Sequence, residues 1–187
     1  KGLKMPTGIA FRGGALYVAD IDKIYKYPNA EASLDNMPAP EVVYDDLPSY
    51  MAHGWKYLTF DKEGWLWVPI GPPFNIGLPP AGNAQIRRIN PENGLAEVRA
   101  LGVRNSVGGD IDPRSGDFWF SENARDWLSD NTPSDKLNHV TRTGEHFGYP
   151  YCHQGNIPDP KFAMGHKCSE FTPPVLNLGA HVAPLGM

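Results

Sequence analysis

The sequence predicts an all-β protein that forms part of a β-propeller. Three observations support this prediction. Apolar residues alternate with polar ones over short stretches, which is typical of half-buried strands. A strand–turn–strand pattern returns about every 50 residues, the period of propeller blades. No stretch has the spacing of an amphipathic helix, and 11% of the 187 residues are aromatic, which is enough to build a core.

The repeat consists of a short alternating strand, a glycine-containing turn, an aromatic or β-branched strand and a further strand that ends in a polar turn. The turns read RGG, KEG and RSG, and glycine supplies the positive φ that tight hairpins need. The second strands are 50 and 52 residues apart and read Leu16-Tyr17-Val18, Leu66-Trp67-Val68 and Phe118-Trp119-Phe120. This agreement in pattern and spacing predicts three equivalent blades.

The repeats divide the chain into blade-like units near 7–50, 51–103 and 104–150. Residues 151–187 are loop-rich and are expected to lead into the next blade. The whole of 1–187 is thus predicted to be one partial propeller domain of about three to three and a half blades. The chain starts without methionine, and we expect it to be a fragment that is inactive alone, because a propeller closes on itself.

Charge and motifs narrow the function. The net charge of -4 and the absence of a Lys/Arg cluster argue against a nucleic-acid partner. No apolar run approaches the ~20 residues of a membrane span. No phosphate loop, nucleophile elbow or HExxH motif occurs, so a nucleotide enzyme or a serine hydrolase is not supported.

The two cysteines lie in one Pro/Gly-rich stretch, YCHQGNIPDPKFAMGHKC. A Cys152–Cys168 disulfide would close a loop of roughly 15 residues and contribute on the order of 3 kcal/mol, and it would imply an oxidising compartment. The alternatives are two free thiols, or zinc held by both cysteines with His153 and His166. Adjacent Cys and His rarely reach the same tetrahedral ion, so the disulfide is favoured.

Two residues at equivalent repeat positions are candidates for chemistry. His53 precedes the first strand of the second repeat, and Arg104 holds the same place 51 residues later in GVRNSVGGDID. Both are expected to face one axial mouth, where a histidine beside an arginine suits proton abstraction next to developing negative charge. The alternatives are a strand-capping histidine and a surface arginine paired with a carboxylate.

Four carboxylates occur in the stretch SENARDWLSDNTPSDKLNHV: Glu122, Asp126, Asp130 and Asp135. Calcium takes six to eight oxygen ligands, and a long loop with carboxylates and carbonyls can supply them. The alternative is a solvated acidic loop.

The motifs HGWKYLTFDKEGWLWVPIG, RNSVGGDIDPRSGDFWFSENARDWLSD, DKLNHVTRTGEHFGYPYCH and LGAHVAPLGM occur in this order along nearly the whole chain. In this combination they resemble the soluble quinoprotein sugar dehydrogenases, especially the L-sorbosone dehydrogenase-like branch. The resemblance implies a six-bladed propeller, pyrroloquinoline quinone (PQQ) as cofactor, bound calcium and a periplasmic or secreted location. It also implies a sugar or sugar-aldehyde substrate and an external electron acceptor, a quinone or a cytochrome.

The resemblance assigns roles to individual residues. The family's catalytic base opens an H-x-x-x-x-L strand, which matches His53 ahead of Leu58. Its G-x-R-N motif contacts the quinone, which matches Arg104 and Asn105.

The same resemblance places Asn123 with the cofactor and the cofactor's calcium at the backbone carbonyls near Ala124 and Arg125. The chain carries Lys136 where the resemblance implies glutamate, and it therefore lacks that carboxylate ligand of a second calcium site. Two other functions stay open: a non-catalytic recognition propeller of the same superfamily, and a calcium-dependent lactonase-like hydrolase.

Overall fold

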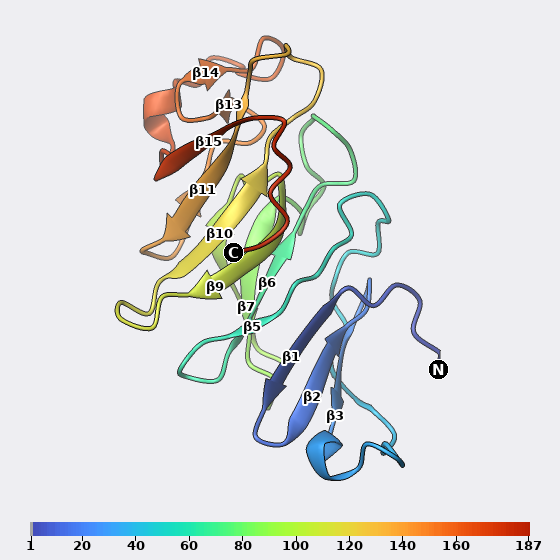
Figure 1. The fold of residues 1–187 in the computed structure, drawn as a ribbon. Coiled ribbons are helices and arrows are strands. Elements are labelled where there is room, and N and C mark those ends of the chain that lie inside the picture. Colours follow the sequence, from blue (N-terminus) through green and yellow to red (C-terminus); the bar gives the residue numbers. More distant parts are fainter. Residues whose placement is uncertain (1) are drawn as a thin grey trace.

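A computed structural model describes residues 2–187 and shows three large antiparallel sheets that follow one another along the chain (Figure 1). The first sheet contains β1 (Gly8–Arg12), β2 (Ala15–Ala19), β3 (Ile24–Tyr27) and β4 (Glu41–Tyr44). The second contains β5 (Thr59–Phe60), β6 (Leu66–Ile70), β7 (Gln85–Ile89) and β8 (Ala96–Leu101). The third contains β9 (Asn105–Ile111), β10 (Phe118–Asn123), β11 (Ser134–Val140) and β15 (Leu176–Ala180). The all-β prediction is confirmed.

Each sheet is a meander whose second strand carries the aromatic or β-branched motif of the repeat. β2, β6 and β10 each pair with the strand before and the strand after them. The β1–β2 turn uses Gly13 and Gly14, whose φ values of 58° and 78° are accessible to glycine at little cost. Within residues 2–187, the helical content is confined to two single 3₁₀ turns, η1 (Ala30–Ala32) and η2 (Cys168–Glu170).

The second sheet is buried on both faces because it lies between the other two. In β6, Leu66, Val68 and Ile70 pack toward the first sheet, whereas Trp67 packs toward the third. Side chains alternate across a strand, so a strand with two buried faces needs an almost continuous apolar run. Trp67 stacks on Phe118 of β10 with 4.9 Å between ring centroids, which ties the second sheet to the third.

The third sheet differs from the sequence-based division of the chain. Its fourth strand is β15, so part of the segment 151–187, which had been expected to lead into a next blade, returns to the third sheet. Residues 141–175 are therefore an insertion between β11 and β15. The sequence pattern missed this because the fourth strand carries little aromatic signal and stands about 35 residues from its neighbour.

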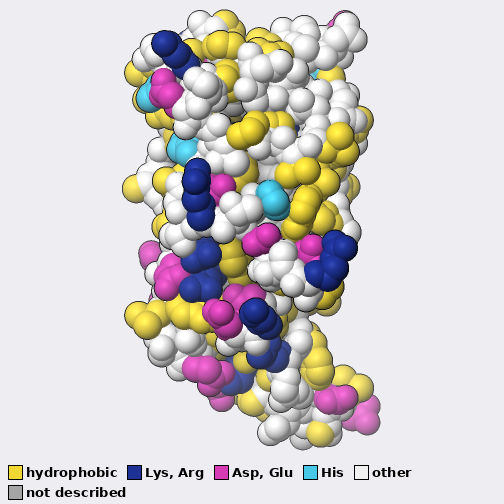
Figure 2. Space-filling view, turned by 90° about the vertical axis from the view of Figure 1, so that its left-hand side faces the viewer, with side chains coloured by type: hydrophobic (Ala, Val, Ile, Leu, Met, Phe, Trp, Pro, Cys, Tyr) yellow, Lys and Arg dark blue, Asp and Glu magenta, His cyan; other side chains and the backbone are white. Residues whose placement is uncertain are grey.

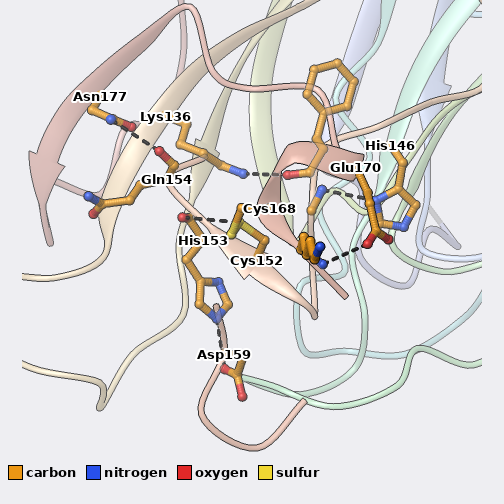
Figure 3. Close-up of a disulfide and its surroundings, with 12 residues drawn as sticks. Lys136, His146, Cys152, His153, Gln154, Asp159, Cys168, Glu170 and Asn177 are labelled. Carbon is orange, nitrogen blue, oxygen red and sulfur yellow. Dashed lines mark hydrogen bonds and ion pairs between the residues drawn. A yellow bond between two sulfur atoms is a disulfide. The ribbon is translucent and has the colours of Figure 1, made fainter. Parts of the chain in front are cut away.

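The insertion is compact and is closed by a disulfide. It contributes β12 (Glu145–His146), which adds in parallel to β8 of the second sheet, and the hairpin of β13 (Cys152–His153) and β14 (Ile157–Pro158). Cys152 and Cys168 are bonded, with 5.4 Å between their Cα atoms. Figure 3 shows the disulfide beside the His153–Asp159 contact and the Lys136 side chain. The disulfide prediction is confirmed, and the zinc and free-thiol interpretations are wrong.

The face drawn in Figure 2 mixes Lys/Arg with Asp/Glu side chains and carries no extended basic field. Over residues 2–187, no helix has the length and apolar character needed to cross a bilayer.

Candidate active site

One cavity of about 240 Å³ gathers most of the residues singled out from the sequence. Its lining includes His53, Arg104, Asn105, Asn123 and Ala124. It is completed by Asp126, Asp135, His181 and Ala183. Arg125 does not line it, because its guanidinium turns away to Asp159 of the insertion, with 2.7 Å between Nη1 and Oδ2. His53 and Arg104 therefore line one cavity, while the axial mouth and the chemical roles remain predictions.

His53 stands in a turn before β5 and is held there in one tautomer. Its Nδ1 lies 2.7 Å from the carbonyl oxygen of Pro72. A carbonyl can only accept, so Nδ1 carries the hydrogen and Nε2 of the neutral ring keeps a free lone pair. Burial, and then the charge of Arg104, lower the pKa of His53 below 6.5. Both effects keep the ring neutral and able to accept a proton at neutral pH.

Gly71, which directly follows β6, lets the His53 and Arg104 segments approach each other. A methyl group at Gly71 would lie 2.6 Å from the Cβ of His53 and 2.8 Å from the carbonyl oxygen of Arg104. Contacts this short force a shift of the backbone. The Gly71 carbonyl also accepts a 2.6 Å hydrogen bond from Asn83, so this strand end cannot easily move aside.

Arg104, directly before β9, is buried and uses four of its five N–H donors within the protein. Nε donates to Asn75 O at 2.8 Å, Nη1 to Asn123 O at 3.1 Å, and Nη2 to Asn75 Oδ1 at 2.9 Å and to Asp126 Oδ2 at 3.2 Å. One Nη1 hydrogen is left for a ligand. Burial lowers the pKa of Arg104 from 12.5, but a guanidinium stays cationic at neutral pH.

The buried ion pair of Glu122 and Lys136 holds the backbone of Arg104 in place. Glu122 Oε1 accepts the Arg104 amide at 2.9 Å, and its Oε2 lies 3.0 Å from both Lys136 Nζ and Asn138 Nδ2. Lys136 also donates to Phe147 O at 3.0 Å. Glu122 and Lys136 are both almost completely buried, so each charge depends on the other. Lys136 thus serves as the partner of Glu122.

The side-chain amides of the two asparagines in the cavity differ in how many hydrogen bonds they make within the protein. Asn123, the last residue of β10, donates to Asn105 O at 3.3 Å and to Pro184 O at 3.0 Å. The Asn105 side chain makes no hydrogen bond within residues 2–187 and lines the cavity. Its two N–H donors and its carbonyl are therefore available to a ligand.

The acidic stretch does not form the expected calcium loop. Glu122 faces Lys136, and Asp135 accepts the amides of Ala124 at 2.7 Å and Ala183 at 2.8 Å. Asp126 and Asp130 are exposed on the connecting loop. In the described part of the chain, no three His, Cys, Asp or Glu side chains gather into a metal-binding group. The four carboxylates belong to separate contacts because two lie in strands and two in the loop.

His181 and Asp135 line the cavity but were not assigned to it from the sequence. His181 Nε2 donates to Ser129 O at 2.9 Å. A short signal for His181 did exist, because the Ala-His pair of GAHVAPLG also occurs in MAHGWKYL at the start of the second repeat. The 35-residue insertion broke the period that would have revealed it.

Known structures share this fold. The iodide structure of a family AA12 carbohydrate-active enzyme from Trichoderma reesei matches with a TM-score of 0.83 and 23% identity, over 96% of this chain and 57% of that one. The holo pyranose dehydrogenase PQQ domain from Coprinopsis cinerea matches with a TM-score of 0.79 and 19% identity, over 96% and 56%. The PQQ-bound aldose sugar dehydrogenase from Streptomyces coelicolor matches with a TM-score of 0.60 and 20% identity, over 88% and 48%.

Sequence comparison agrees with the resemblance drawn from the motifs. An uncharacterized protein of Borreliella burgdorferi is 36% identical over 198 residues, which cover all of this chain and 52% of that protein. The chain thus spans about half the length of the curated relative it matches. The family model described as TrAA12-like matches residues 2–187, and the chain therefore belongs to the TrAA12-like family.

Proposed function

We propose that this chain carries part of the active site of a PQQ-dependent dehydrogenase that oxidises a sugar or sugar aldehyde. The observation that carries the proposal is the pairing of a neutral, acceptor-ready His53 with the Arg104 guanidinium at one cavity. Two of the fold relatives are, by name, a pyranose dehydrogenase PQQ domain and a PQQ-bound aldose sugar dehydrogenase.

The free donors of the cavity fit a quinone. Asn105 offers an unused amide, and Arg104 offers one unused N–H together with its positive charge. A quinone oxygen is an acceptor that gains negative charge on reduction, so a guanidinium and an amide are suitable partners. Bound PQQ would supply the two-electron acceptor for the hydride that leaves the sugar carbon.

His53 would act on the substrate. Its free Nε2 would take the hydroxyl proton of a hemiacetal or hydrate as the hydride departs, so that the C–OH group becomes C=O. The hydrogen bond from Nδ1 to the Pro72 carbonyl fixes the ring of this cavity-lining histidine and leaves Nε2 free to accept a proton. Arg104, held by Asn75 and Glu122, would keep its charge at a fixed place and so need no rearrangement during the reaction.

Three further expectations accompany this function. Calcium would be held by backbone carbonyls near Ala124 and Arg125. The disulfide supports a periplasmic or secreted location, because such bonds persist in oxidising compartments. The electron acceptor is expected to be an external quinone or cytochrome.

The test uses the full-length protein that carries this chain, loaded with PQQ and Ca²⁺ and assayed for sugar-dependent dye reduction. We expect activity with at least one aldose or with sorbosone, and a loss of about 10²–10⁴-fold in kcat for His53→Gln, as for removal of a general base. His166→Gln is the matched control, because His166 is exposed and lies outside the cavity. Unchanged activity of His53→Gln would overturn the assignment of the base, and failure to bind PQQ would overturn the function.

A further inference from the structure

Trp127 is the most exposed of the large apolar side chains in residues 2–187, with 87% of its surface open to solvent. Its φ of 58° places it in the left-handed region, which is unfavourable for a bulky side chain. An exposed tryptophan in an unfavourable backbone conformation is a candidate ligand contact.

The loop that carries Trp127 is fastened on both sides. Before it, the Asp126 amide donates to Asn75 Oδ1 at 2.7 Å, and Asn75 Nδ2 donates back to Asp126 O at 3.0 Å. After it, Ser129 O accepts the 2.9 Å hydrogen bond from His181. The indole is therefore displayed from a fixed backbone, and the same Asn75 also holds Arg104.

Trp127 lies in an open groove of about 510 Å³ that adjoins the active-site cavity. Its lining consists of Asp126, Trp127, Leu128, Ser129, Asp130 and His181. Asp126 and His181 also line the cavity that contains His53. A ligand in the cavity and a ligand in the groove would therefore have Asp126 and His181 as common neighbours.

The chemistry of the groove suits a neutral, hydroxyl-rich ring. An indole face packs against the C–H face of a sugar, and carboxylates accept hydroxyl hydrogens. Oδ1 of Asp126 and both oxygens of Asp130 make no hydrogen bond within the described residues. Two carboxylates at one groove disfavour an anionic ligand.

We propose that Trp127, with Asp126 and Asp130, forms a second sugar subsite, which holds the ring glycosidically linked to the ring that reacts beside His53. The inference rests on the proposed function, since it takes the cavity as the place of oxidation. It deepens that function by making an oligosaccharide a better ligand than a monosaccharide.

The experiment separates binding from turnover. In the full-length protein, calorimetric titration with glucose, cellotriose and maltotriose is run for wild type, Trp127→Ala and Trp127→Phe. We expect one trisaccharide to bind more tightly than glucose, and Trp127→Ala to weaken that binding on the order of tenfold, as for loss of an aromatic contact. Trp127→Phe, which keeps a stacking face, should retain most of the affinity.

A second readout is the ratio of kcat/KM for the trisaccharide to that for glucose, which should fall in Trp127→Ala by a similar factor. Trisaccharides that bind no better than glucose, or a Trp127→Ala variant that binds them as wild type does, would overturn the subsite while leaving sugar oxidation intact. Trp127-dependent binding in a protein without PQQ-dependent oxidation would support the subsite and overturn the proposed function.

Discussion

Replacing Lys56 with methionine should stabilise the protein. The Lys56 side chain is 1% exposed, and its Nζ makes a single hydrogen bond within residues 2–187, to Gly54 O at 3.0 Å. No carboxylate in the described chain pairs with it. Burial alone lowers the pKa of Lys56 from 10.5 to about 8. The buried charged ammonium group therefore destabilises the folded protein.

The size of the effect follows from the pKa. At 1.36 kcal/mol per unit, the lowering to about 8 corresponds to about 3 kcal/mol of lost stability while the group is charged. Methionine keeps an unbranched chain of similar volume and removes the charge. It also gives up the bond to Gly54, worth about 1 kcal/mol. The free energy of unfolding should therefore rise by about 1–2 kcal/mol at pH 7.

The pH dependence gives the sharper assay. The unfolded chain binds the Lys56 proton up to about pH 10.5 and the folded protein only up to about 8, so wild-type stability should increase with pH between these values. Urea unfolding of wild type and Lys56→Met, with exposed Lys62→Met as control, should show this increase only where Lys56 is present. A Lys56→Met variant that is less stable than wild type at pH 7, or one that keeps the increase, would refute the reasoning.

Three further predictions concern the cavity and the insertion. Because Arg104 lowers and Asp126 raises the pKa of His53, an NMR titration should give a higher His53 pKa in Arg104→Met and a lower one in Asp126→Asn; shifts in the same direction would contradict this electrostatic picture. Gly71→Ala should lower kcat/KM by about 10²-fold while the circular dichroism spectrum stays native, because the added methyl group displaces His53 and Arg104. A variant with wild-type turnover would show that the backbone after β6 shifts to accommodate the methyl group without moving these two residues. Burial lowers the pKa of His153 to about 4, so the free energy of unfolding should fall by on the order of 3 kcal/mol as the pH drops from about 6.5 to 4. The His153→Gln variant should lose this pH dependence of stability. If the pH dependence persists in the variant, it comes from other groups.

The sequence predicted the sheets best where one strand faces two neighbours. β6 reads as a continuous apolar run because Leu66 and Trp67 point to different cores, and such a run is visible without any structure. β15 was missed because Leu176 and its neighbours are half-exposed and follow a long insertion. Pairing between strands that are far apart in the sequence depends on tertiary packing, and the local pattern of apolar residues contains no information about that packing.

The candidate site was predictable where it followed the repeat. His53 and Arg104 occupy equivalent positions one period apart, so their meeting at one cavity could be expected. The partners of the buried charged side chains could not be predicted from the sequence. Glu122 was expected in a solvated or calcium-binding loop, but β10 and β11 bring it against Lys136. Pairing of buried charges depends on register between strands, and a single sequence does not specify it.

The strand β12 gives the second and third sheets a link besides their shared core. It leaves the third sheet through the insertion and completes the edge of the second by pairing with Ala100 and Leu101. At these two residues β8 is no longer open to pairing with other chains. The two sheets should also open together in native-state hydrogen exchange, so that reduction of the disulfide loosens the amides of β8 as well as those of the insertion.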